Sequence, residues 1–427
     1  MILARGILGI AGLVLLAWLM SSNRRRFPWK TVIIGIILQW LLAYAVLRTD
    51  TGRAFFDGMG RIVTTVLYGA DQGAKFVFGP LAGNDPAVAW KGIVGIKIMI
   101  TIIVVATISS IGYHYGILQR VVTAMAWVMT KPMGLSGAES LSGAANIFLG
   151  QTEAPLLVRP YIPDMTRSEL MSMMTCGFST VAAGVLAYYI TMLGGDDPER
   201  QVGVARHLMT ASMMTAPAGF VIAKVMLPES ERPRTAAGAK VVLERETSGL
   251  LDAMTTGASE GMKLAINVIA MLIAFIAIIT IVDAGLIALG KLSFMTPVVH
   301  AMGLERLDLD GLLGLIFSPI AWLVGVDWTD CRVFGGLLGK AMATNEIIAY
   351  GSLRDIIDNG GMSERAIIMA IYSLCGFANF SSIGIQIGGL GGLTPNRRAD
   401  FVRLGPRAML GGAMACWMTG CIAGLML

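Results

Sequence analysis

The sequence has few charged residues for its length. Asp, Glu, Lys and Arg make up 14% of the 427 residues, whereas a soluble domain carries about 25%. So little charge cannot cover a water-facing surface, which excludes the two or three soluble domains that the length would otherwise allow. Hydrophobic residues reach 55%, and the mean hydropathy is +0.70. The composition therefore predicts an integral membrane protein.

Side chains suited to metal binding or acid–base chemistry are also scarce. The cysteines form no CxxC pair and lie mostly in apolar runs, at positions 176, 331, 375, 416 and 421. We interpret them as small buried hydrophobic residues. The histidines are far apart and lack HExxH spacing, at positions 114, 207 and 300. Without a nucleophile–base pair or a metal cluster in the sequence, we predict that the protein is not an enzyme.

Long uncharged runs predict the membrane spans. A transmembrane helix needs about 20 predominantly apolar residues, and the runs that approach this length are 6–23, 31–47, 98–119, 170–195, 208–223, 264–282, 366–396 and 408–427. We therefore predict an all-α polytopic membrane protein with eight transmembrane helices. The first run resembles the apolar region of a signal peptide. Three arginines follow it without a small-residue cleavage site, so we expect a retained helix.

Basic clusters predict the orientation in the membrane. They follow the first, fifth and seventh spans, at 24–30, 232–245 and 397–407, whereas the connection at 195–206 is of mixed charge. Because cytoplasmic loops carry the excess of Lys and Arg, we expect a multi-pass inner-membrane protein with both termini periplasmic. Topology then explains the net charge of +5, and we predict no nucleic-acid partner.

Two further stretches have an apolar face but are not simple spans. Residues 117–132 are expected to lie along the cytoplasmic interface, and residues 55–68 along the outer one. The alternative for both stretches is amphipathic packing against the rest of the protein.

The chain contains two related halves. The first reads Gln151-Thr-Glu-Ala-Pro and then Cys176-Gly-Phe, and the second reads Thr344-Asn-Glu-Ile-Ile and then Cys375-Gly-Phe. The glutamate of the first half precedes the fourth span, which runs outward. The glutamate of the second half precedes the seventh span, which runs inward. Inverted repeats of this kind are typical of secondary transporters.

Each of these glutamates lies in an apolar stretch that is broken in the middle. Gly150 and Pro155 interrupt residues 134–163, and several glycines precede Glu346 in residues 333–353. We predict two re-entrant helical hairpins, one from each side of the membrane. A broken helix at membrane depth is tolerated where it lines a cavity, and an intramembrane carboxylate indicates a functional site. The alternative is that both glutamates lie at hairpin tips in water.

The polar residues near the breaks indicate the kind of solute. They are uncharged hydrogen-bonding side chains: Asn146, Gln151, Thr152, Thr180, Asn345, Asn379, Ser381 and Ser382. With the carboxylates as acceptors, this set suits a neutral solute rich in donors and acceptors. The sequence contains no GxxxxGK[ST] loop for ATP, so we expect an ion gradient to drive transport.

Three motifs closely resemble those of the concentrative nucleoside transporters. They are Gly150-Gln-Thr-Glu-Ala-Pro-Leu-Leu, Asn345-Glu346 and Cys375-Gly-Phe-Ala-Asn-Phe-Ser-Ser-Ile-Gly, and the likeness runs from about residue 51 to the C-terminus. The resemblance implies a homotrimer whose protomers have eight spans, two hairpins, a scaffold domain and a mobile transport domain. It further implies sodium symport of a nucleoside such as uridine by an elevator-type movement.

The resemblance also implies the roles of individual residues. The residues expected to contact the nucleobase are Gln151, Thr152, Glu153 and Val185. Those expected at the ribose are Glu346, Asn379 and Ser382, with Phe377 lining the pocket. A sodium site would use the side chains of Asn146 and Thr180 and the backbone carbonyls of Leu149 and Val181.

These elements divide the chain into four expected parts. Residues 1–116 form scaffold helices, and residues 117–227 form the first transport repeat with its interfacial helix and hairpin. Residues 228–300 contain a cytoplasmic loop and a further scaffold span. Residues 301–427 form the second repeat.

Two departures from the family pattern bear on the site. Lys340 directly follows Gly339, where the family commonly has Gly-x-Lys, so its role is open. Thr180 stands where Ser is typical and keeps an oxygen ligand. The alternatives to sodium-coupled nucleoside import are proton-coupled nucleoside symport and ion-coupled transport of another neutral polar solute.

Overall fold

The computed structural model describes residues 2–82, 93–195, 197–236 and 247–427, which form helices and turns without a strand. Asp196, Lys240 and Arg245, which belong to the charged connections considered above, lie outside these described residues. All five cysteines are buried and carry free thiols. This burial agrees with their interpretation as small hydrophobic residues.

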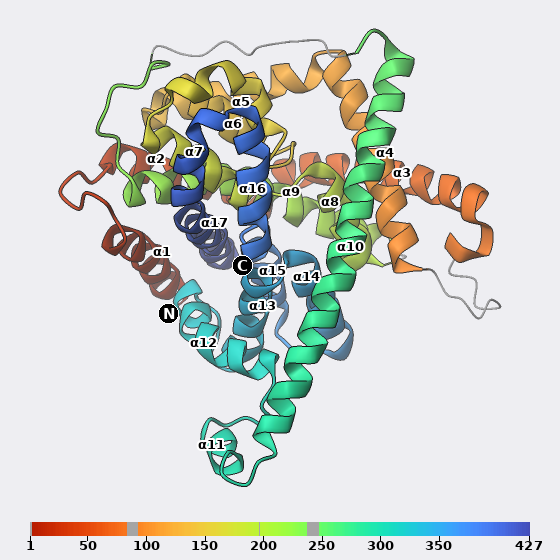
Figure 1. Ribbon diagram of the computed structural model, residues 1–427, viewed down its shortest axis with the longest axis vertical. Helices are drawn as coiled ribbons and strands as arrows, with labels where there is room; N and C mark the ends of the chain where they lie inside the picture. The colour runs from red at the N-terminus through yellow and green to blue at the C-terminus, as the bar shows by residue number, and fades with distance from the viewer. Residues whose placement is uncertain (1, 83–92, 196, 237–246) are drawn as a thin grey trace.

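Five helices do not belong to the two series described below: α1 (Ile2–Leu19), α2 (Trp29–Arg48), α3 (Asp50–Phe78), α4 (Val94–His114) and α10 (Leu250–Gly290). Of these, α3, α4 and α10 lie at one edge of the molecule (Figure 1), whereas α1 and α2 pack against α9 and α17. The long helix α10 packs along α4. Glycines allow the close approach, because a Cβ on Gly257 would lie 2.7 Å from the Cα of Thr107. Of the 18 most apolar consecutive residues of α10, only 6% are buried.

The other helices form two series that correspond in order. The first consists of α5 (Ile117–Met133), α6 (Gly137–Ala145), η2 (Ala154–Asp164), α7 (Arg167–Ser179), α8 (Ala183–Gly194) and α9 (Pro198–Met226). The second consists of α12 (Leu309–Val324), α13 (Cys331–Ala343), α14 (Glu346–Asn359), α15 (Glu364–Ser373), α16 (Phe380–Leu393) and α17 (Arg398–Met426). The helices α9 and α17, which close the two series, each have 29 residues. The order of elements around the two motifs is therefore the same over six elements.

The core lies where the two series pack together. Helix α17 packs against α7, α9, α15 and α16. Of its 18 most apolar consecutive residues, 89% are buried. Its many small residues allow these approaches. A Cβ on Gly412, for example, would lie 2.5 Å from the Cβ of Phe178.

Two expected spans are broken rather than continuous. Residues 170–195 divide into α7 and α8, and residues 366–396 divide into α15 and α16. Between α7 and α8 the backbone is extended, with φ −116° and ψ 164° at Thr180. Uncharged runs cannot reveal such breaks, since an extended segment is as apolar as a helix.

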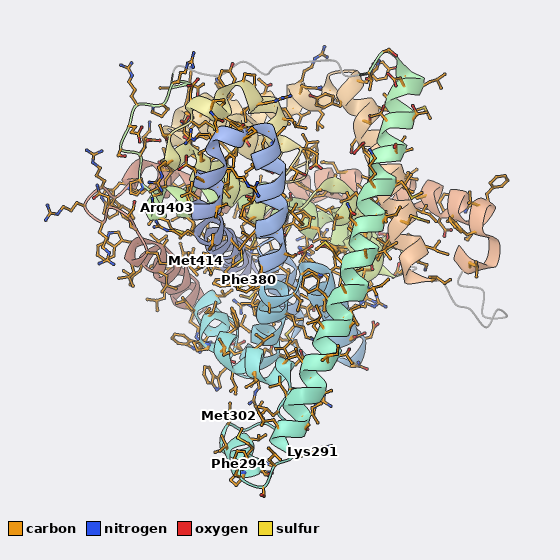
Figure 2. All side chains as sticks on the ribbon, viewed as in Figure 1. Lys291, Phe294, Met302, Phe380, Arg403 and Met414 are labelled. Atoms are coloured by element: carbon orange, nitrogen blue, oxygen red, sulfur yellow. The ribbon has the colours of Figure 1, made fainter. Side chains whose placement is uncertain are left out.

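The structure also contains a helix that the spans did not include. Helix α12 has 16 residues, as many as the run 208–223 that was counted as a span, and it packs against α13. Short α11 (Thr296–Ala301) lies beyond the end of α10, where Figure 2 labels Phe294 and Met302. Among the described residues, six helical segments are long and apolar enough to cross a membrane, and α1, α12 and α16 are shorter apolar helices.

The chain ends and the basic connections lie at defined ends of the molecule. A Cβ on Gly6 would meet the side chain of Leu425, so α1 begins beside the end of α17. At the opposite ends of these helices, the Arg407 guanidinium donates to the carbonyls of Met20 and Met226. The ends of α1 and α9, after which two of the basic connections begin, therefore lie beside Arg407, at the end of the third.

Candidate functional site

Glu346 lies at the start of α14 and is held by two side chains. Asn345 caps the helix, its Oδ1 accepting from the Ile348 amide at 3.0 Å. The Glu346 side chain is buried, with 3% exposed. Its Oε1 accepts from the Tyr189 hydroxyl at 3.0 Å, and its Oε2 accepts from Asn379 Nδ2 at 2.8 Å. The helix N-terminus also favours the negative charge.

Asn379 connects this carboxylate to α16. Its Oδ1 accepts from the Ser382 amide at 2.9 Å and from the Ser381 hydroxyl at 2.7 Å, which caps the helix. Because Oδ1 is used for the cap, Nδ2 is left to face Glu346. Ser382 is buried, and Phe377 is half-buried in the segment between α15 and α16.

The turn between α6 and η2 carries three of the four residues expected at the nucleobase, and the fourth, Val185, is buried in α8. Gln151 is buried, and its Oε1 accepts from Gln386 Nε2 of α16 at 3.0 Å. Thr152 donates to Glu153 Oε1 at 3.0 Å. Glu153 itself is exposed, so its environment differs from that of Glu346. The two glutamates occur in similar motifs, and the motifs do not indicate which glutamate is buried by other helices.

The residues expected to hold sodium gather beside the break between α7 and α8. The Ala183 amide donates to the Phe148 carbonyl at 3.2 Å, which holds the end of α6 against this break. Asn146 is fully buried, and its Nδ2 donates to the Ser142 carbonyl. Its Oδ1 has no hydrogen-bond partner among the described residues. A buried acceptor of this kind fits a cation ligand.

The other expected ligands flank the same turn. Thr180 is buried and donates to the Cys176 carbonyl at 2.8 Å, which leaves its oxygen lone pairs as acceptors. Val181 is buried in the extended segment, and Leu149 follows the turn that ends α6. Side-chain and backbone oxygens without formal charge are suitable sodium ligands.

Lys340 lies apart from the residues expected to bind the nucleoside and the sodium ion. Its Nζ lies 2.8 Å from Asp310 Oδ2 of α12 and donates to the Ser352 hydroxyl of α14 at 2.7 Å. The lysine therefore ties α13 to its two neighbours.

Comparison with known proteins gives the family. Models of the Na+ dependent nucleoside transporter C-terminus and N-terminus match residues 207–424 and 8–81, and a nucleoside recognition gate model matches residues 95–196. The chain is 37% identical to an uncharacterized transporter, YutK, of Bacillus subtilis, over 98% of both chains. The chain belongs to the concentrative nucleoside transporter family. This is a family of transporters and not of enzymes.

Animal members of the concentrative nucleoside transporter family are longer. Mouse solute carrier family 28 member 3 is 38% identical over 98% of this chain, which spans 58% of the length of the mouse protein. Rat sodium/nucleoside cotransporter 1 is 35% identical, and 63% of its length is covered.

Solved structures of the family share the fold. CNTnw in an inward-facing substrate-bound state has a TM-score of 0.90 at 32% identity, covering 100% of this chain and 99% of its own. A CNTnw variant in an outward-facing state has a TM-score of 0.88 at the same identity, covering 100% of this chain and 98% of its own.

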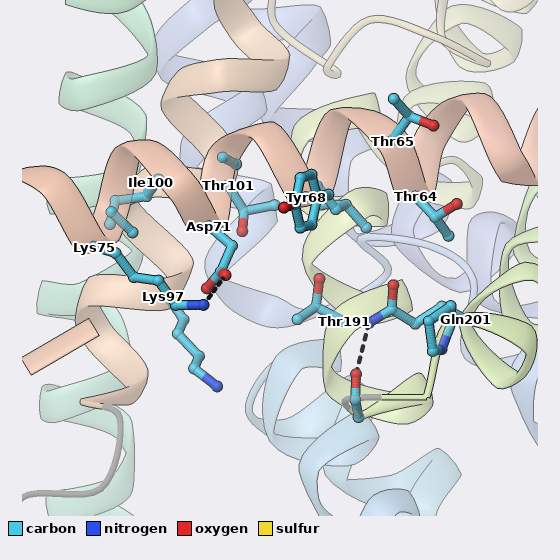
Figure 3. A pocket seen from close by; sticks show the side chains of 15 residues that line it. Thr64, Thr65, Tyr68, Asp71, Lys75, Lys97, Ile100, Thr101, Thr191 and Gln201 are labelled. Carbon is cyan, nitrogen blue, oxygen red and sulfur yellow. Dashed lines mark hydrogen bonds and ion pairs between the residues drawn. The ribbon is translucent and has the colours of Figure 1, made fainter. Parts of the chain in front are cut away.

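A separate cavity of about 620 Å³ lies between α3, α4 and the connection from α8 to α9 (Figure 3). Its wall includes Thr64, Thr191 and Gln201, and the Asp71–Lys75 ion pair of 2.6 Å. None of the residues expected at the nucleoside or the sodium ion lines it. In this member of the concentrative nucleoside transporters, the cavity is therefore distinct from the candidate site.

Two buried residues that contact the candidate site residues were not predicted from the sequence. Tyr189 lies in an apolar run, and nothing in the sequence relates it to Glu346. Gln386 gives a readable signal, because it is a lone amide in an apolar helix, one turn after Ser382 and two turns after Asn379.

Proposed function

We propose that this transporter imports nucleosides such as uridine by sodium symport, as a secondary active transporter. The observation that carries the proposal is the buried Glu346 carboxylate, held by Tyr189 and Asn379 at the meeting of the two repeats. A buried carboxylate costs free energy and indicates a function. Its remaining lone pairs can accept hydrogen bonds from ribose hydroxyls.

The proposed site divides between the two repeats. Glu346, Asn379 and Ser382 bind the ribose, with Phe377 lining the pocket. The nucleobase is contacted by residues of the first repeat: Gln151, Thr152, Glu153 and Val185. Apart from the two carboxylates, which can accept hydrogen bonds, the polar side chains of this set are uncharged, and this supports an uncharged polar substrate.

The proposed coupling ion is sodium, which is cargo rather than a resident cofactor. Its ligands are the side chains of Asn146 and Thr180 and the carbonyls of Leu149 and Val181. The unpartnered, buried Oδ1 of Asn146 supports this assignment, and so does the name of the rat sodium/nucleoside cotransporter. An ion bound at the end of α6 would stabilise the hairpin turn that carries Gln151.

We propose an elevator-type alternating access between two domains. Residues 1–116 and 228–300 form the scaffold, and the repeats at 117–227 and 301–427 form the mobile part. The eight spans include α7 with α8 and α15 with α16 as two broken spans, and the re-entrant hairpins are α6 with η2 and α13 with α14. Inward- and outward-facing structures of the related CNTnw support this movement.

The proposed assembly is a homotrimer in the inner membrane with periplasmic termini. The apolar surface of α10, most of it exposed in the single chain, is available for lipid and for contact with neighbouring protomers. The adjacency of Gly6 and Leu425 supports termini on the same side. The meeting of basic connections at Arg407 supports the cytoplasmic assignment of the other end.

Uptake of radiolabelled uridine into proteoliposomes tests this function. We expect saturable accumulation driven by an inward sodium gradient, and none when choline replaces sodium. Uptake that follows a pH gradient and ignores sodium would favour the proton-coupled alternative. Competition by unlabelled nucleosides, nucleobases and amino acids identifies the solute class, and a lack of nucleoside competition would contradict the proposal.

A further inference from the structure

Gln386 is a buried amide in the middle of an apolar helix. Its side chain is 1% exposed, and the buried face of α16 consists of Ser382, Gln386 and Leu390. Burying an amide costs free energy unless its hydrogen bonds are made. A leucine would fill this position without that cost, so the contacts of the amide are informative.

The orientation of the Gln386 amide follows from its partners. Nε2 donates to the Met174 carbonyl at 3.1 Å and to Gln151 Oε1 at 3.0 Å. A backbone carbonyl can only accept, so the Gln386 atom that faces Met174 has to be the nitrogen. Both N–H groups of Gln386 are thereby used, one of them on Gln151.

This contact also fixes the orientation of the Gln151 side-chain amide. The Gln151 atom that faces a donor has to be its oxygen, and its own Nε2 becomes the end that can donate to another group. The Oε1 of Gln386 is buried and meets no hydrogen-bond donor in the part of the chain that the structure describes. An unsatisfied buried acceptor is costly and points to a ligand or water that supplies an N–H or O–H.

One helix face connects both halves of the proposed site. Asn379 begins α16 and donates to Glu346, while Gln386, seven residues later, donates to Gln151. At a rise of about 1.5 Å per residue, these contacts are about 10 Å apart along the axis. The ribose-binding carboxylate and the base-binding amide are thus held on a common rigid support.

We propose that Gln386 is a positioning residue for nucleobase recognition: it sets Gln151 as a donor and adds an adjacent acceptor. The inference rests on the proposed function and names a substrate class within it. We assign the Gln151 donor to the exocyclic position of the base and the Gln386 acceptor to the neighbouring ring nitrogen. In this order the pair complements a lactam edge, where a carbonyl oxygen adjoins a ring N–H, and it mismatches the reverse order of groups. Uracil and hypoxanthine present this edge, whereas cytosine and adenine present an amino group beside a bare ring nitrogen.

Equilibrium binding to the full-length protein in sodium tests the assignment. We expect uridine to bind about tenfold more tightly than cytidine, and inosine about tenfold more tightly than adenosine, since the wrong edge leaves buried groups unpaired. In Gln386→Met, which removes the amide at similar length, both ratios should fall to within about twofold of one. In a Gln151→Leu background, Gln386→Met should cause no further change in either ratio.

Further measurements distinguish a failure of the proposed role of Gln386 from a failure of the proposed nucleoside binding. Weaker binding of a 3′-deoxynucleoside, the mark of the ribose contact, should persist in Gln386→Met. Wild-type ratios in Gln386→Met would overturn the role of Gln386, and equal binding of uridine and cytidine by the wild-type protein would overturn the lactam assignment. A wild-type protein that binds no nucleoside would instead contradict the proposed function.

A substrate-side measurement needs no variant that could fail to fold. 3-Methyluridine replaces the ring N–H by a methyl group and keeps the ribose and both carbonyls. We expect the wild-type protein to bind it at least about tenfold more weakly than uridine. Equal binding of the two compounds would show that no acceptor reads this N–H.

Discussion

The Tyr189 hydroxyl donates a hydrogen bond to Glu346 Oε1 at 3.0 Å, and this bond joins the two repeats. Tyr189 belongs to α8 of the first repeat, and Glu346 begins α14 of the second. With Asn379 on the other oxygen, the carboxylate is oriented by two partners. A carboxylate fixed in this way loses less conformational entropy when a substrate hydroxyl donates to it.

Removing the Tyr189 hydroxyl should therefore weaken nucleoside binding. In Tyr189→Phe, one oxygen of the buried carboxylate loses its donor, and a hydrogen bond to a charged group contributes about 1.5–3 kcal/mol. We expect uridine affinity, measured by calorimetry in sodium, to fall by about tenfold.

Tyr350→Phe is the matched control. The Tyr350 ring lies 4.3 Å from that of Tyr189, but its hydroxyl donates to the Ile371 carbonyl at 2.8 Å. This variant should lower the melting temperature without a tenfold loss of affinity. Equal effects of the two substitutions on binding would contradict a specific role of Tyr189.

Glu346→Gln and Glu346→Ala test the proposed ribose contact. Both variants should insert into the membrane and fold, because removing a buried charge relieves its desolvation cost, and both should abolish uridine uptake. A 3′-deoxynucleoside should bind wild-type protein at least about tenfold more weakly than its parent. In Glu346→Ala this difference should collapse, as a binding cycle with four combinations would measure. Full discrimination in the variant would exclude the carboxylate as the reader of the 3′-hydroxyl.

Thr180 tests the proposed sodium site. Thr180→Val is nearly isosteric but lacks the hydroxyl. Because one oxygen ligand is lost, the sodium concentration for half-maximal uptake should rise several-fold. Thr180→Ser keeps the oxygen and should have a mild effect. The sodium dependence of initial uptake rates measures both variants. A sodium dependence unchanged in Thr180→Val would remove this residue from the site.

A buried ion pair supports the start of α6. Lys224 Nζ lies 2.8 Å from Glu139 Oε2, with side chains 6% and 1% exposed. Glu139 also closes the capping box that begins α6. Because breaking a buried pair leaves one charge uncompensated, Lys224→Met should destabilise the protein by about 3–5 kcal/mol in thermal unfolding.

The exposed pair of Lys263 and Glu260 is the control for this prediction. Its atoms are 2.6 Å apart, but the side chains are 67% and 63% exposed, so Lys263→Met should cost less than about 1 kcal/mol. Adding Glu139→Gln to Lys224→Met should restore part of the lost stability, since the uncompensated charge is removed. Equal losses in the two lysine variants would contradict a buried, uncompensated Glu139.

Local sequence determined the membrane character, the paired motifs and the residues of the candidate site. Scarce charge and long apolar runs predict a membrane protein whatever the packing, because they set the cost of exposure to water. The caps at Asn345 and Asn379 are also local, since each side chain bonds an amide three residues on. Asn345 was expected near the site because it lies at a break in an apolar segment, and Asn379 because it lies in a motif that resembles that of the family.

Tertiary structure decided which of these residues lie together. Glu153 and Glu346 occur in matching motifs, yet only Glu346 is covered by other elements, among them α8 and α16. The contacts of Tyr189 with Glu346 and of Gln386 with Gln151 join residues more than 150 positions apart. Local propensity carries no information about such pairs, because burial and hydrogen-bond geometry arise only when distant helices pack.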